Sequence, residues 1–130
     1  MLTTNEISTE LFSYLSGVAG IPATYYIDST ERPLDSHIRA YIMPAVSVSN
    51  GFGDNDGAKQ VGLIYLNIFV KAAANANFKS GDYAELLSDA FKKGTDTGQI
   101  CFIKPPNIKP PIADNGFLMR SVICEYTIFT

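Results

Sequence analysis

The sequence predicts an α+β fold in which two helices pack on one face of a mixed or antiparallel sheet of about four to five strands. Residues 4–16 and 81–93 repeat apolar side chains at the spacing of an amphipathic helix. Residues 44–49, 61–71 and 117–129 are rich in the β-branched, aromatic and alternating apolar residues of strands. The chain has 130 residues, 46% hydrophobic and 18% charged, which predicts one domain over residues 1–130.

The first helix has clear start and stop signals. Thr3 and Glu6 form the T-x-x-E pattern of a capping box. Gly17, Gly20 and Pro22 follow the helix and prevent its continuation. The predicted apolar face consists of Ile7, Leu11, Tyr14, Leu15 and Val18.

A short strand and a loop are predicted next. Thr24–Ile27 favours a strand, and the charged stretch Asp28–His37 favours an exposed loop with His37 as a loop histidine. Pro44–Ser49 alternates apolar and small polar residues, which predicts a strand with one buried face.

A hairpin loop and a long strand follow. Asn50–Lys59 holds three glycines and two aspartates, which predicts a flexible hairpin loop. Val61–Lys71 is its partner strand, and it is apolar on both faces at Leu63, Ile64 and Leu66. We therefore expect this strand in the centre of the sheet or at a subunit contact.

The second helix is predicted over Gly81–Lys93, after a linker at Ala72–Asn77, with Ser80 as its N-cap and Gly94 at C′. Its predicted buried stripe consists of Tyr83, Leu86, Leu87, Ala90 and Phe91.

The last third of the chain predicts two strands around a proline-rich segment. Ile100–Ile103 is a short strand, and Pro105–Pro111 is a stiff segment that cannot lie in the middle of a sheet. Asn115–Gly116 is a turn before the longest strand, Phe117–Phe129. Its two faces are Phe117, Met119, Ile123 and Phe129 on one side, and Leu118, Val122, Cys124, Tyr126 and Ile128 on the other.

Charge and cysteine content narrow the function classes. Ten Lys and Arg against thirteen Asp and Glu give a net charge of −3, which argues against tight binding to nucleic-acid phosphates. The N-terminus lacks the basic and apolar regions of a signal peptide, and no apolar run is long enough to span a bilayer. We expect a soluble protein made in a reducing cytosol, with Cys101 and Cys124 as reduced core residues and a disulfide as the less favoured alternative.

The motifs favour no catalytic, cofactor or metal site. Gly51-Phe-Gly53 precedes a strand rather than the helix that a dinucleotide fingerprint requires. In an EF-hand register, the loop around Asp54 and Asp56 would place its first and last ligands at Phe52 and Leu63, which cannot bind calcium. We therefore predict no catalytic residue, no cofactor-binding residue and no metal ligand, and a protein that is not an enzyme.

A family resemblance rests on the middle of the chain. Met43–Ser49, the Gly- and Asp-rich loop after it, and Tyr65–Lys71 resemble tail terminator proteins of long-tailed phages, the family of lambda minor tail protein U. In that family a PAV-x-V strand pairs through an acidic loop with a long apolar strand, and a helix and a final strand follow. The similarity in length and element order covers nearly the whole chain, but Pro105–Pro111 departs from the family's pattern.

The resemblance implies a phage or prophage structural protein that acts in the virion tail and is made in the cytoplasm of the bacterial host. It would form a homo-oligomeric ring, a hexamer, that caps the tail tube, ends tail polymerisation and joins the tail to the head connector. Its partners would be the tail tube protein and the head–tail connector protein, and DNA would pass through without specific binding. The candidate subunit or partner contacts are Phe52, Asp54, Asp56, Lys59, Tyr65 and Asn67.

Two alternatives stay open. The first is a head–tail connector or stopper ring of the same particle, which the sequence hardly separates from a terminator. The second is a small ligand-binding or enzyme domain that uses a pocket between helix and sheet, with His37, Asp35 and Tyr25 as its polar groups. A regulatory protein with a nucleic-acid-reading helix is disfavoured because neither predicted helix is basic.

Overall fold

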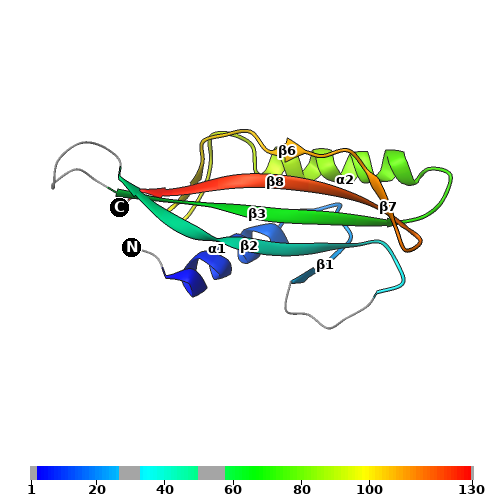
Figure 1. The fold of residues 1–130 in the computed structure, drawn as a ribbon, viewed down its shortest axis with the longest axis horizontal. Helices are drawn as coiled ribbons and strands as arrows, with labels where there is room; N and C mark the ends of the chain where they lie inside the picture. The colour runs from blue at the N-terminus through cyan, green and yellow to red at the C-terminus, as the bar shows by residue number, and fades with distance from the viewer. Residues whose placement is uncertain (1–2, 27–32, 50–57, 130) are drawn as a thin grey trace.

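The computed structural model of the chain describes residues 3–26, 33–49 and 58–129, and shows two helices on one side of a curved sheet (Figure 1). The sheet has eight strands in the order β1-β2-β3-β8-β5-β4, and β6 and β7 pair with β8 as well. Strands β1 and β2 are parallel and the other pairs are antiparallel. The elements are α1 Thr4–Ser16, β1 Ala23–Tyr26, β2 His37–Ser49, β3 Ala58–Lys71, α2 Ala76–Ala90, β4 Thr95–Thr97, β5 Ile100–Phe102, β6 Asn107–Ile108, β7 Ile112–Asp114 and β8 Phe117–Phe129.

The α+β class and the mixed sheet are confirmed, but the prediction of four to five strands was too low. The additional strands β4, β6 and β7 have only two or three residues each. Such short segments carry no measurable alternation, and they become strands because β5 and β8 offer them a pairing edge.

Helix α1 has the predicted bounds because its start is determined locally. The Thr3 amide donates to Glu6 Oε1 over 3.1 Å, and the Glu6 amide donates to Thr3 Oγ1 over 3.2 Å, so both bonds of the capping box are present. Ile7, Leu11 and Leu15 are buried against the sheet.

Strand β2 is longer than predicted. It begins at His37 rather than Pro44, and it contains a bulge between Met43 and Val46. Pro44 lies at this bulge, where its missing N–H does not interrupt a regular ladder. The Tyr126 hydroxyl donates to the Met43 carbonyl at the bulge over 3.2 Å. Strand β3 lies between β2 and β8, in the central position that the sequence predicts.

Helix α2 begins earlier and ends earlier than predicted. Ser80 is fully buried inside the helix instead of forming its N-cap. The Ser80 hydroxyl donates to the Asn77 carbonyl over 2.9 Å and accepts from Arg120 Nε over 3.2 Å. This contact with β8 fixes the first turns of the helix. Leu86 was predicted to be buried and is 39% exposed, because the inward side of the helix is centred on Ala84 and Leu87.

Strand β8 has its predicted bounds and faces. Val122, Cys124, Tyr126 and Ile128 are buried on the helix side. Asn115 and Gly116 have φ values of 47° and 82°, as a tight turn between β7 and β8 requires. The proline-rich segment contributes β6, which pairs with β8 away from the centre of the sheet.

Both helices share one hydrophobic core with the sheet. Phe91, just after α2, is fully buried and forms edge-to-face contacts with Tyr14 of α1 and Phe102 of β5, with ring centroids 5.1 and 5.2 Å apart. The Tyr14 hydroxyl donates to the Ala90 carbonyl and ties the two helices together. Within the described residues, neither helix is long and apolar enough to cross a membrane.

Cys124 yields a prediction about stability at alkaline pH. The thiol is free and buried in β8, and this burial raises its pKa from 9.0 to about 12. The unfolded chain therefore releases this proton at lower pH than the folded chain, and the stabilisation is complete below pH 9 and is lost as the pH rises toward 12. We expect the free energy of unfolding to fall by about 1.4 kcal/mol per pH unit from this group over that range.

Urea denaturation at successive pH values above 9 measures this slope. Burial also raises the pKa of Tyr126, so Cys124→Ala is the comparison that isolates the thiol. The variant should lose stability less steeply than the parent chain. Equal slopes for the two proteins would show that the Cys124 thiol ionises alike in both states.

Candidate assembly interface on the open face of the sheet

On the side of the sheet away from the helices, the described part of the chain forms no covering layer (Figure 1). Alternate residues of β2, β3 and β8 point to this side, while their neighbours enter the core. We call this surface the open face. Its cross-strand rows are His37–Phe69–Met119, Arg39–Asn67–Ser121, Tyr41–Tyr65–Ile123 and Met43–Leu63–Glu125.

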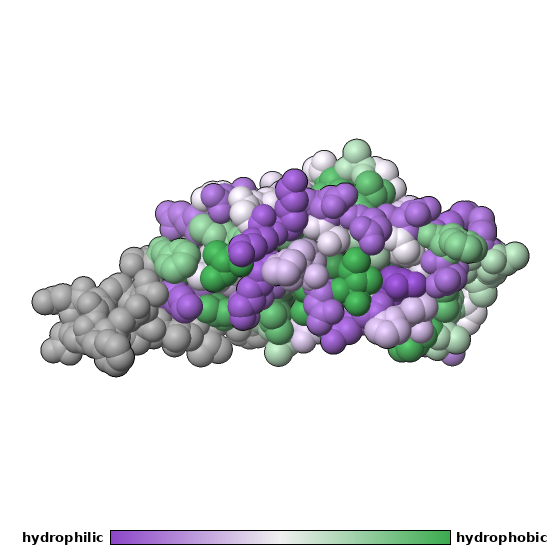
Figure 2. Space-filling model, turned by 90° about the horizontal axis from the view of Figure 1, so that it is seen from above, coloured by the Kyte–Doolittle hydropathy of each residue, from purple (hydrophilic) through white to green (hydrophobic). Residues whose placement is uncertain are grey.

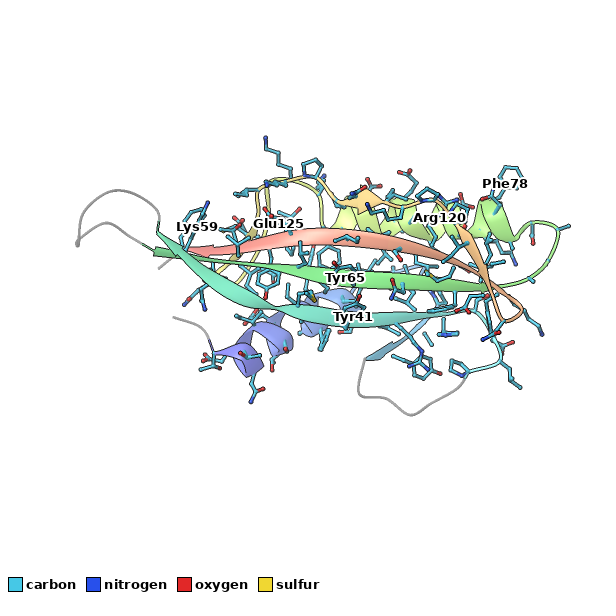
Figure 3. The ribbon with its side chains drawn as sticks, viewed as in Figure 1. Tyr41, Lys59, Tyr65, Phe78, Arg120 and Glu125 are labelled. Carbon is cyan, nitrogen blue, oxygen red and sulfur yellow. The ribbon has the colours of Figure 1, made fainter. Side chains whose placement is uncertain are left out.

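A tyrosine pair occupies the middle of the open face. Tyr41 and Tyr65 lie side by side on neighbouring strands, with their rings stacked at 4.7 Å and an interplanar angle of 3° (Figure 3). Partial burial, with the neighbouring Tyr65 as a smaller cause, raises the pKa of Tyr41. Met43 is 45% exposed nearby. The tyrosine pair and the neighbouring Met43 therefore present a rigid aromatic and apolar surface, with the tyrosine hydroxyl groups at its edge.

Around the tyrosines, the open face has polar contacts of its own. The Ser121 hydroxyl donates to Asn67 Oδ1 over 2.7 Å, which links β8 to β3. At the next row, Lys104 Nζ lies 3.4 Å from Glu125 Oε2. The surface thus combines aromatic and apolar side chains with polar ones.

An aromatic hollow lies at the end of the open face where β2 begins. His37 is 5% exposed, stacks on Phe69 at 4.8 Å and meets Phe117 edge-on at 5.4 Å. The His37 Nδ1 atom lies 2.9 Å from the Asp35 carbonyl oxygen, so Nδ1 carries the proton and donates. The hollow has a volume of about 220 Å³, and its lining consists of Pro33, His37, Arg39, Phe69, Asp114, Asn115 and Phe117.

His37 was predicted to be a loop residue, and this was wrong. It is the first residue of β2, and the cross-strand stack on Phe69 buries it. The predicted polar group of His37, Asp35 and Tyr25 does come together, but on the face opposite the helices. Asp35 contributes a backbone carbonyl there and not its carboxylate.

The structure places half of the predicted contact residues on the open face. Lys59, Tyr65 and Asn67 all belong to the alternate residues of β3 that point away from the core. Phe52, Asp54 and Asp56 lie outside the described residues. Tyr41 and Phe69 were not among the predicted contacts, because their neighbours on the open face depend on the register of β2 against β3. The alternation along each strand indicates their side of the sheet but not their partners.

Helix α2 carries a second exposed hydrophobic group on the opposite side of the molecule. Phe78 is 75% exposed in the first helical turns and points away from the body (Figure 3). From above, on the side of α2 and β6, hydrophobic side chains are scattered between hydrophilic ones (Figure 2). Phe78 is therefore a strongly exposed apolar side chain of this helix.

The chemistry of these surfaces favours protein contact over small-molecule binding. The aromatic hollow is smaller than the range of about 300–1,000 Å³ typical of ligand pockets. In the described part of the chain, no three His, Cys, Asp or Glu side chains are grouped so as to hold a metal ion. Stacked tyrosines and an exposed methionine are the residue types enriched in protein interfaces.

Comparison with known proteins supports the fold. No family model matches the sequence, and no curated protein matches it. Nine chains of solved structures match the fold. One of them aligns with a TM-score of 0.64 and 14% sequence identity, over 98% of this chain and 96% of its own length. The similarity extends over the whole of both chains, and at this identity it shows the fold alone.

Proposed function

We propose that this chain is a tail terminator subunit of a long-tailed phage or prophage. It forms a ring on the finished tail tube, ends tail polymerisation and joins the tail to the head connector. The observation that carries the proposal is the open face, an aromatic and apolar side of a long sheet that no helix of the described chain covers. Its function is assembly, without a reaction or a cofactor.

The strands β3 and β8 have apolar side chains on both of their sides. One side of β3 and β8 fills the core, and the other side still exposes parts of Leu63, Tyr65 and Ile123. Contiguous apolar surface of this kind is usual where a partner covers it. A ring subunit needs two such surfaces, because each head-to-tail contact joins different patches of neighbouring copies.

The charge of the chain also suits a ring around DNA. The net charge of −3 gives no strong attraction for phosphates, so DNA would slide through the channel without being held. The tail tube protein and the connector protein would meet the two rims of the ring.

The test is the mass of the purified protein, measured by light scattering over a range of concentration and salt. We expect a species of about six times the 14.1 kDa of one chain. Addition of the ring to polymerising tail tube protein from the same phage should stop tube growth at one end. A chain that stays at 14.1 kDa, alone and with tube protein, contradicts the proposal. Binding to the connector alone would instead favour a head–tail connector or stopper.

A further inference from the structure

We infer that the ring contact is made by Phe78 of one copy, which enters the aromatic hollow on the open face of the next copy. This inference rests on the proposed function, and it names the two surfaces that the ring would join. Its occupant is a second copy of this chain.

Phe78 leads a stripe along the outward side of α2. Phe78, Asp82, Glu85 and Asp89 follow one another at spacings of four, three and four residues, and all four are exposed. These spacings place them on one side of a helix. The buried residues Ala76, Ser80, Ala84 and Leu87 mark the inward side. The stripe therefore points away from its own sheet and is available to a neighbour.

The hollow has the size and chemistry to receive a phenyl ring. Its volume is about 220 Å³, and the rings of His37, Phe69 and Phe117 form part of its lining. An entering ring would find partners for edge-to-face packing on these three side chains. Arg39 also lines the hollow and offers a guanidinium group to the face of the ring.

The charges of the two surfaces match in order and in spacing. Asp82 lies four residues after Phe78, about 6 Å along the helix axis. Arg39 lies two residues after His37, about 7 Å along β2. With Phe78 in the hollow, the first acid of the stripe reaches Arg39. Asp114 also lines the hollow, but its carboxylate has the same charge as the stripe. Within the lining, the attraction for Asp82 therefore comes from Arg39.

The match continues along the open face. Glu85 and Asp89 lie about 10 and 16 Å from Phe78 along the axis of α2. The Tyr41–Tyr65 row lies about 13 Å from His37 along β2. Phenol hydroxyls donate to carboxylates, so the tyrosine row offers hydrogen-bond donors to these acids. Lys104 and Glu125 form a salt bridge, and the three acids of the stripe take no part in it.

The contact is heterologous, since the stripe and the open face lie on opposite sides of one subunit. Repetition of such a contact closes a ring when the rotation between neighbouring copies adds up to a full turn, and it builds a filament when it does not.

Phe78→Ser tests the inference. It should reduce the oligomer to the 14.1 kDa monomer in light scattering while the far-UV circular dichroism stays unchanged. The matched control is Phe129→Ser, which removes a 48% exposed phenylalanine at the other end of β8. This control should keep the oligomer. Arg39→Glu, which places a negative charge opposite Asp82, should also give a monomer.

Mixing the two defective variants makes the test specific for a head-to-tail contact. Phe78→Ser keeps an intact hollow, and Arg39→Glu keeps an intact stripe, so the mixture can form one good contact and should give dimers. Monomers in the mixture would overturn the inference. An oligomer that persists in Phe78→Ser would also overturn it, and so would the loss of the oligomer in the control Phe129→Ser. A parent chain that is monomeric at every concentration would overturn it too. The tube-growth assay then decides the proposed function separately, because it requires no particular contact residue.

Discussion

Phe91→Ala is expected to lower the free energy of unfolding by about 3–5 kcal/mol, the usual cost of removing a buried phenylalanine. Phe91 is fully buried where α1, α2 and β5 meet, and its ring contacts those of Tyr14 and Phe102. The substitution removes the ring and leaves a cavity that the surrounding strands can fill only in part. Because small domains are stable by about 5–15 kcal/mol, this one change removes a large share of the total.

Urea denaturation followed by far-UV circular dichroism measures the loss at one fixed protein concentration, since assembly makes stability depend on concentration. Phe129→Ala is the control, because this ring is 48% exposed at the end of β8 and lies outside the proposed ring contact. It should change the stability of the monomer by less than about 0.5 kcal/mol. Equal losses for the two variants would show that the junction between the helices does not hold the fold together.

Gly62→Ala is expected to destabilise the protein by about 1–3 kcal/mol or more, although it adds only one methyl group. Gly62 lies opposite Tyr126 in the β3–β8 ladder. A Cβ atom on Gly62 would lie 2.4 Å from Cζ and Oη of Tyr126, closer than any real contact. Tyr126 has little freedom to move, because it is fully buried and its hydroxyl donates to the Met43 carbonyl at the β2 bulge.

Two comparisons make this result specific. In a Tyr126→Leu background the ring is absent, so Gly62→Ala should cost little, and a double-mutant cycle should give a coupling energy of about 0.5–3 kcal/mol. Gly81→Ala has the opposite expected sign, because a Cβ there meets nothing within 4 Å and the residue lies inside α2. It should stabilise the helix by up to about 1 kcal/mol. Additive effects at positions 62 and 126 would exclude the steric explanation.

The candidate site was accessible to sequence reasoning only in part. The alternation along β3 places Lys59, Tyr65 and Asn67 on one face, and these were among the predicted contacts. Tyr41 joins them only because β2 pairs with β3 in a register that puts Tyr41 opposite Tyr65. That register includes a bulge between Met43 and Val46, and although Pro44 is compatible with a bulge, it does not determine which residues of β3 pair with β2. The aromatic hollow likewise combines residues from four strands.

The sequence by itself determined the elements whose signals lie within a few residues of one another. The capping box of Thr3 and Glu6 began α1, and Asn115–Gly116 formed the turn before β8. Both depend on local backbone geometry and hydrogen bonds, which are independent of the rest of the fold.

Only the tertiary structure decided which side chains were buried and where α2 began. Arg120 bonds to Ser80 across forty residues and makes Ser80 a buried helical residue instead of an N-cap. His37 is buried because Phe69 stacks on it from the neighbouring strand. Gly62 is required because Tyr126 fills the space opposite it. Each of these results depends on a contact between distant parts of the chain, and such a contact has no counterpart in a local sequence pattern.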